Sequence, residues 1–181
     1  PRRQEEQNLI SFGTGGWRAV IGEGFTLHNV RRLAQALANN IIRRKEDQRG
    51  VVIGFDRRFL SDAAAEAAAE VFAGNNIPTI LLTEDAPTPL ITYATAILNS
   101  AYGLAFTASH NPPEWNGLKV FHGDGSLLLD DETRQIEAET NTLSPAEVVK
   151  TELDIALDAG IVQRRDFTNQ YVDAVEALID L

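Results

Sequence analysis

The sequence has no cysteine in its 181 residues, which removes three kinds of chemistry at once. Without cysteine there is no disulfide, no thiolate metal site and no cysteine nucleophile. Histidine is scarce as well, and the three copies, His28, His110 and His122, are too few and too scattered for a histidine-rich metal site. The candidate nucleophiles and ligands are therefore hydroxyl groups, carboxylates and basic side chains.

Positive charge and long apolar runs are also limited. The 16 lysines and arginines face 26 aspartates and glutamates, which gives a net charge of −10. A broad nucleic-acid surface is basic overall, so this balance argues against one while leaving room for a small basic pocket for an anion. No run approaches the roughly 18 apolar residues of a membrane span, and no charged-then-apolar leader opens the chain. We expect a soluble, cytoplasmic protein with neither nucleic-acid nor membrane partners.

What is present is an alternation of helical and extended patterns in a chain of one-domain length. Segments with helical periodicity or helix-forming composition alternate with short apolar runs, which predicts crossover connections and a mainly parallel sheet covered by helices. The predicted fold is a three-layer α/β/α sandwich. The predicted helices are 27–44, 62–73 and 90–98, and the predicted strands are 51–55, 77–82 and 101–106.

The pattern changes after residue 106. A short apolar run at 117–121 is followed by the turn cluster 122–126, and 127–129 can supply a returning strand. That strand would give the sheet an antiparallel edge, so we expect a mixed sheet. The segments 131–140 and 166–181 are predicted to be helical, the second with its apolar residues on one face.

A hydroxyl nucleophile stands beside an imidazole in Thr107-Ala108-Ser109-His110-Asn111-Pro112. This segment follows the apolar run 101–106, so Ser109 is expected at the carboxyl end of a strand, the edge where open α/β sheets bind ligands. His110 is a poor base for Ser109, because neighbouring side chains of extended chain point to opposite faces. Serine, asparagine and proline are common turn formers, and on spacing alone an ordinary turn is the simpler interpretation.

Two further segments are rich in groups that bind anions. Phe12-Gly13-Thr14-Gly15-Gly16-Trp17-Arg18 joins glycines, which let backbone N–H groups approach an anion, to an arginine that can grip phosphate through two parallel hydrogen bonds. It is neither a P-loop nor G-x-G-x-x-G, so it could equally be a lead-in with Trp17 packed on the core. Lys119 could neutralise a phosphate or act as a base, although a lone lysine is more often a solvated surface charge.

In combination these segments resemble one family. Thr107–Pro112 (TASHNP), followed by Asn116–Lys119 (NGLK), is similar to the active-site region of the α-D-phosphohexomutases, the phosphoglucomutase and phosphomannomutase superfamily. Phe12–Arg18 resembles that family's FGTSGxRG opening, and Gly54-Phe55-Asp56-Arg57-Arg58 with Ser61 resembles its GxDxRxxS strand exit. Four motifs in this order are far more specific than any one of them. The resemblance assigns residues 1–165 to the first of the family's four domains and 166–181 to a helix leading to a second domain that this chain lacks.

The resemblance implies a role for each matching residue. Ser109 would carry a phosphoryl group, give it to a hexose monophosphate, and recover the other phosphate after the bound bisphosphate has turned around. His110, Lys119 and Arg18 would line the transfer site, with Lys119 the better candidate for general acid/base work. The residues implied to bind substrate or phosphate are Thr14, Gly15, Arg18 and Asn111.

The resemblance also implies groups that this chain cannot supply alone. One oxygen of the phosphate on Ser109 would bind Mg²⁺ together with three aspartates of a DGDxDR loop in the second domain, and a hexose 1,6-bisphosphate would serve as activator. The family's sugar-recognition loop and terminal phosphate loop are missing from the sequence. We therefore expect the complete polypeptide to interconvert hexose 1- and 6-phosphates, of glucose or mannose first, and the isolated chain to turn over little.

Some residues depart from the family pattern, and two other classes of function compete. Gly15 stands where the family often has serine, and Ala19 stands where it often has glycine, which leaves the detailed role of the first loop open. A noncatalytic α/β module that binds phosphate or another anion is the main rival. A serine hydrolase is disfavoured because the sequence has no G-x-S-x-G elbow and no plausible triad acid.

Overall fold

A computed structural model describes residues 9–13 and 15–179. The described strands are β1 (Phe12–Gly13), β2 (Gly16–Val20), β3 (Val51–Phe55), β4 (Thr79–Leu82), β5 (Tyr102–Phe106), β6 (Trp115–His122) and β7 (Val162–Arg165). The helices are α2 (Leu27–Arg43), α3 (Ser61–Gly74), α4 (Thr88–Leu98), α5 (Asp130–Thr142), α6 (Leu153–Asp158) and α7 (Thr168–Glu176), with short 3₁₀ turns at Asp47–Arg49 and Pro145–Glu147.

The strands form one sheet in the order β1-β2-β6-β5-β3-β4-β7. Strands β5, β3, β4 and β7 pair in parallel, whereas β6 is antiparallel to both β5 and β2, and β1 is antiparallel to β2. Five strands (β2, β3, β4, β5 and β7) therefore run one way, and two (β1 and β6) run the other. The expectation of a mixed, mainly parallel sheet is confirmed.

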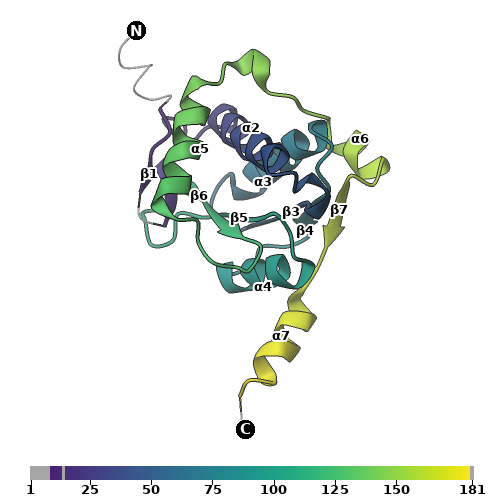
Figure 1. Ribbon diagram of the computed structural model, residues 1–181. Coiled ribbons are helices and arrows are strands. Elements are labelled where there is room, and N and C mark those ends of the chain that lie inside the picture. The colour runs from purple at the N-terminus through teal and green to yellow at the C-terminus, as the bar shows by residue number, and fades with distance from the viewer. Residues whose placement is uncertain (1–8, 14, 180–181) are drawn as a thin grey trace.

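Helices cover both faces of this sheet (Figure 1). Alternate residues of β3 show the division, because Val51 and Ile53 pack into the core beneath α2 and α3, while Val52 packs with Leu90 and Ile91 of α4 on the other face. The predicted three-layer α/β/α sandwich is confirmed. Helix α7 projects away from these layers, and none of its residues is buried.

Local chemistry explains where the two long helices lie. Thr26 caps α2, since its Oγ1 accepts a hydrogen bond of 3.1 Å from the backbone N–H of Asn29. Helix α3 is rich in alanine, a strong helix former, and its small side chains let it pack closely against both α2 and the sheet. The same helix starts directly after the β3 exit loop, which brings its first turn to the carboxyl edge of the sheet.

Several predicted elements differ from the structure. Residues 127–129 do not form a strand: Leu127 makes only an isolated bridge to Phe121, and the antiparallel part of the sheet comes from β6, β2 and β1. The glycine-rich opening contains two strands, and 153–165 contains α6 and β7, neither of which we predicted. The last helix is shorter than predicted. Among the described residues, no helix is both long and apolar enough to cross a membrane.

Candidate functional site

The exit loops of two neighbouring parallel strands meet at the carboxyl edge of the sheet. Phe55 at the end of β3 lies opposite Phe106 at the end of β5, and the backbone N–H of Asp56 donates to the carbonyl of Phe106 at 3.0 Å. This register places the loop after β3 beside residues 107–114, which we call the serine loop. Ser109 therefore stands where the sequence predicted it, at the edge that binds ligands in open α/β sheets.

Ser109 has an exposed side chain on a left-handed backbone, with φ of 58°. This conformation is uncommon for a residue other than glycine. The Ser109 N–H donates to Thr107 Oγ1 at 2.9 Å, and the Asn111 N–H closes a tight turn onto the Ala108 carbonyl at 3.1 Å. His110 is also exposed. Within the described residues, neither the Ser109 hydroxyl nor the His110 ring has a hydrogen-bond partner.

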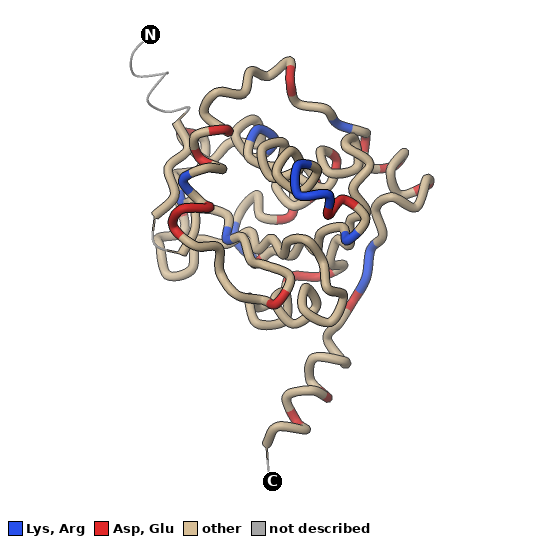
Figure 2. Tube along the Cα trace, in the orientation of Figure 1, with Lys and Arg blue, Asp and Glu red and all other residues tan. Residues whose placement is uncertain are grey.

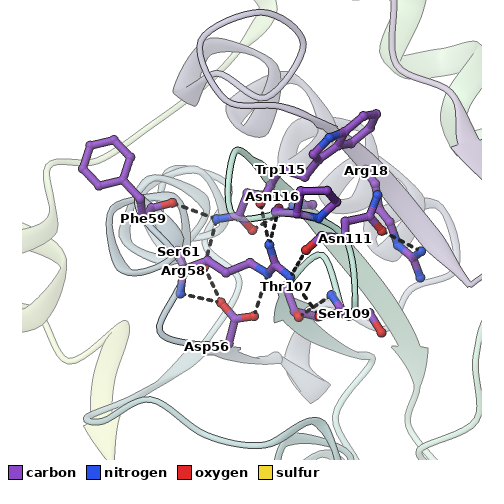
Figure 3. Close-up of polar contacts among 12 residues, drawn as sticks. Arg18, Asp56, Arg58, Phe59, Ser61, Thr107, Ser109, Asn111, Trp115 and Asn116 are labelled. Carbon is purple, nitrogen blue, oxygen red and sulfur yellow. Dashed lines mark hydrogen bonds and ion pairs between the residues drawn. The ribbon is translucent and has the colours of Figure 1, made fainter.

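The guanidinium of Arg58 lies under the serine loop and donates to its main-chain carbonyls (Figure 3). Its Nη2 atom lies 2.8 Å from the carbonyl oxygen of Ser109 and 2.7 Å from that of Asn111. Its Nη1 atom lies 2.8 Å from the carbonyl oxygen of Pro112 and 3.0 Å from that of Trp115. One side chain from the β3 exit thus contacts three residues of the serine loop and the first residue of β6.

Asp56, together with the buried Ser61 and Asn116, holds Arg58 in place. Asp56 accepts hydrogen bonds through Oδ1 from the Arg58 backbone N–H at 2.9 Å and from Ser61 Oγ at 2.8 Å, and its Oδ2 lies 3.5 Å from Arg58 Nε. The amide of Asn116, which is fully buried, donates to Ser61 Oγ at 2.9 Å and to the Phe59 carbonyl at 3.0 Å. The loop after β3, the start of α3 and the start of β6 are therefore one hydrogen-bonded unit.

Arg18 reaches the serine loop from the antiparallel half of the sheet. It lies in β2 opposite Gly117 of β6, and its Nη1 donates to Asn111 Oδ1 at 3.1 Å. Arg18 and Asn111 were both predicted to bind substrate or phosphate, and here they bind each other. The positive charge that the sequence offered for phosphate is thus brought to the serine loop by strand pairing.

Lys119 lies further along β6, opposite Ala105 of β5. A Cβ atom added at Gly16 would lie 3.1 Å from Lys119 Cγ and nearer still to the Leu118 carbonyl oxygen, so glycine at this position lets the first loop approach the lysine. Gly15 precedes it with φ of 80°. Thr14, which we also predicted to bind phosphate, lies outside the described residues.

An open pocket of about 560 Å³ lies at the serine loop. Arg18, His110 and Lys119 are not among its lining residues, and the described residues contain no cluster of three or more histidines, aspartates or glutamates that could hold a metal. Basic and acidic residues are scattered over the trace (Figure 2), and no lysine or arginine stands between Arg58 and Lys119. The lining residues are Asp56, Arg57, Arg58, Phe59, Ser109, Asn111 and Pro113.

Sequence reasoning missed the contacts of Arg58 and Asn116. Both belong to motifs that carried the family resemblance, so the motifs marked these positions without indicating what the side chains touch. Their partners lie 51 to 57 residues away along the chain for Arg58 and 55 to 57 for Asn116. Contacts at this distance follow from the pairing of β3, β5 and β6 and cannot be read from local spacing.

The fold and the serine loop define a domain of a known enzyme class. Residues 9–147 match the family model of the phosphoglucomutase/phosphomannomutase α/β/α domain I, and the chain belongs to this family.

Comparison with individual proteins gives the same family. The chain is 33% identical over 97% of its length to a phosphoglucomutase of Staphylococcus saprophyticus, and 37% identical over 71% of its length to a probable phosphoribomutase of Schizosaccharomyces pombe. Among solved structures, a putative phosphomannomutase from Thermus thermophilus superposes with a TM-score of 0.81 at 33% identity over 94% of the chain. The chain spans 34% of the staphylococcal protein and 36% of the Thermus chain, about a third of each.

Proposed function

We propose that this chain is the phosphoserine-bearing domain of a sugar-phosphate mutase and that Ser109 carries the phosphoryl group. The observation that supports this most is the contrast within the serine loop. Its backbone is fixed by Arg58 and Thr107, whereas the Ser109 hydroxyl is exposed and has no partner among the described residues. A group that must first accept and then release a phosphoryl group needs open space on one side and a fixed position on the other.

The reaction balances with groups that this site offers. The bond between Ser109 Oγ and phosphorus breaks while a hydroxyl oxygen of a hexose monophosphate bonds to the phosphorus. The hydroxyl proton passes to the neutral amine of Lys119, the candidate base, and the departing serine oxygen takes up a proton from water. The bisphosphate then turns around and the sequence reverses. Such transfer depends on positioning and on cations that stabilise spread negative charge, which Arg18 can supply throughout and Lys119 can supply once it has taken up the hydroxyl proton.

The described residues do not by themselves make a Mg²⁺ site, because they contain no cluster of carboxylates or histidines with ligand spacing. A phosphate on Ser109 would offer one oxygen, a ligand type that Mg²⁺ prefers. When bound, Mg²⁺ would neutralise charge on that phosphate. We propose that its carboxylate ligands come from outside this chain.

Glucose and mannose phosphates are the substrates we propose first, since the family model is named for phosphoglucomutases and phosphomannomutases and the staphylococcal relative is named a phosphoglucomutase. The name of the Schizosaccharomyces relative makes ribose phosphates the second candidate. The ratio of kcat/KM for glucose 1-phosphate to that for ribose 1-phosphate, measured on the complete polypeptide, decides between them.

The phosphate-carrier proposal is tested by intact-mass analysis of the complete polypeptide after incubation with glucose 1,6-bisphosphate. We expect a gain of one phosphate that Ser109→Ala loses and the control Ser126→Ala keeps, because Ser126 lies in the exposed turn after β6 and bonds only within that turn. Conversion of glucose 1-phosphate to glucose 6-phosphate should fall to background in Ser109→Ala alone. Persistent phosphorylation of that variant, or none in the unmodified protein, would favour the noncatalytic anion-binding module.

The share of the site that lies in this chain is tested separately. Residues 1–181 alone should show little mutase turnover beside the complete polypeptide under the same conditions, because the Mg²⁺ ligands and sugar-reading groups are proposed to lie elsewhere. Comparable rates from the two would contradict that division.

A further inference from the structure

Four of the five N–H donors of the Arg58 guanidinium donate to main-chain carbonyl oxygens, those of Ser109, Asn111 and Pro112 in the serine loop and that of Trp115 at the start of β6. The Nε atom lies 3.5 Å from Asp56 Oδ2, which is an ion-pair distance. Arginine has five donors in all, so most of its capacity is used on these carbonyls. The Arg58 side chain is only 15% exposed, so the guanidinium is mostly shielded from solvent.

The serine loop contains neither helix nor strand, and its internal hydrogen bonds are short-range ones at Thr107, Ala108 and Pro112. Its two ends are tied to the sheet, because the Thr107 N–H donates to the Gly117 carbonyl at 3.1 Å and the Ile21 N–H donates to the Glu114 carbonyl at 2.8 Å. Between these ends Arg18 contacts the side chain of Asn111, and within the described residues the hydrogen bonds from outside to the main chain of 108–113 come from Arg58. Ser109 has a left-handed backbone that a serine does not choose freely. A strained residue of this kind persists only where its surroundings over-determine it.

From this geometry we propose that Arg58 is the positioning residue of the phosphate carrier. It draws the carbonyls of Ser109, Asn111, Pro112 and Trp115 to one side of the loop, and it thereby keeps Ser109 left-handed with its hydroxyl on the open side. The proposal rests on the proposed function, because a carrier is what the position serves. Arg58 acts through the loop and is not placed in contact with the transferred group.

The planar guanidinium matters more to this role than the charge does. Lysine would keep the positive charge opposite Asp56, but it has three donors on one nitrogen and cannot span four carbonyls in a plane. Arg58→Lys therefore separates positioning from charge. A matched control is Arg49→Lys, since Arg49 donates to the carbonyls of Asn99 and Ser100 at the other end of the sheet.

The first test measures hydrogen exchange of the backbone amides 107–116 in the 181-residue chain. We expect faster exchange in Arg58→Lys at Ser109 and Asn111, and unchanged exchange there in Arg49→Lys. Equal protection of these amides in Arg58→Lys and the unmodified chain would overturn the proposal. This measurement needs no phosphate, so it decides the role of Arg58 even if Ser109 proves not to be the carrier.

The second test measures mutase kinetics of the same variants in the complete polypeptide. A displaced reacting group costs about 100-fold in rate, so kcat should fall by about that factor in Arg58→Lys while KM changes by less than about threefold. Arg49→Lys should leave both constants unchanged. A loss confined to KM would overturn the proposal, because it would make Arg58 a substrate-binding group. If Arg58→Lys does not fold, Asp56→Asn, which removes the carboxylate facing Arg58 Nε, should show the same pattern more weakly.

Discussion

At each end of the sheet an arginine holds backbone carbonyls beside a residue with a left-handed backbone. The two ends differ in whether the side chain of that residue has a hydrogen-bond partner. At the amino end, Arg49 donates to the carbonyls of Asn99 and Ser100 at 2.9 and 3.1 Å, beside a left-handed Asn99 with φ of 49°. At the carboxyl end, Arg58 does the same for the serine loop, beside a left-handed Ser109. The Asn99 side chain also accepts from Arg49, at 3.0 Å, whereas the Ser109 hydroxyl has no partner among the described residues.

This difference separates a structural turn from a candidate site. At the amino end, the side chain of Asn99 accepts a hydrogen bond from Arg49, the same arginine that holds the backbone. Asparagine also tolerates the left-handed region well. At the carboxyl end an arginine also holds the backbone, but the Ser109 hydroxyl has no partner among the described residues. A free hydroxyl on a fixed and strained backbone is the feature that merits a functional explanation.

The largest expected difference between the two ends comes from adding one methyl group at Gly117, near the start of β6, and at Gly123, directly after β6. In Gly117→Ala the new Cβ would collide with the Trp17 carbonyl oxygen, and in Gly123→Ala it would collide with the Ser100 carbonyl oxygen. Overpacking of this kind costs about 1–3 kcal/mol or more, so both variants should unfold at lower urea concentration. Only Gly117→Ala should also lose mutase activity, since it separates β6 from β2 beside Arg18. Equal activity losses in the two variants would erase the distinction between the ends.

Two asparagines provide the next comparison. Asn116→Ala leaves Ser61 and the Phe59 carbonyl without their buried partner, at a cost of about 1–3 kcal/mol, and it loosens the unit that supports Arg58. Asn99→Ala places alanine in a left-handed conformation at a cost of roughly 1–2 kcal/mol. We expect both to lower the free energy of unfolding in urea titrations and only Asn116→Ala to lower kcat. A fall in kcat for Asn99→Ala would show that the ends are coupled.

The smallest expected effect is a pH dependence confined to the amino end. Burial raises the pKa of Tyr102, whose hydroxyl donates to Asn40 Oδ1 at 2.8 Å and accepts from Arg44 at 2.9 Å. Because the folded pKa lies above the unfolded value of about 10, this stabilisation is present below about pH 10 and is lost as pH rises through the folded pKa. Urea titrations from about pH 8 to about pH 11 should show a shallower alkaline loss in Tyr102→Phe than in the unmodified chain. Phosphorylation of Ser109 should be unaffected at neutral pH.

Sequence reasoning reached the layers of the fold and the location of Ser109 because strong local signals encode both. The runs 51–55 and 101–106 are apolar and short, and the polar loops that follow them mark the carboxyl edge. Strand β7 carries one buried residue, Val162, and three polar ones, because it lies at the sheet edge, and a pattern this polar does not stand out from a loop. The apolar residues at 127–129 indicated a strand, but Leu128 is buried in the core without belonging to a strand.

The members of the candidate site were predictable from the sequence, and their arrangement was not. The position of Ser109 followed from the strand that precedes it, and Arg18 and Asn111 were both predicted as site residues. Arg18 and Asn111 bind each other because β2 pairs with β6. This pairing could not be predicted, since the segment that contains β2 is rich in glycine and does not have a strand pattern. The role of Arg58 depends on the parallel register of β3 and β5, a tertiary property.

The reach of Arg58 also has a consequence for the length of the serine loop. One rigid, planar group spans carbonyls from Ser109 to Trp115, so the chain between them has a fixed contour. We expect an inserted or deleted residue between Ser109 and Trp115 to carry at least one of these carbonyls out of reach of Arg58. Loops of other proteins often vary in length without harm. Here the span of the Arg58 side chain restricts the length of the segment that contains Ser109.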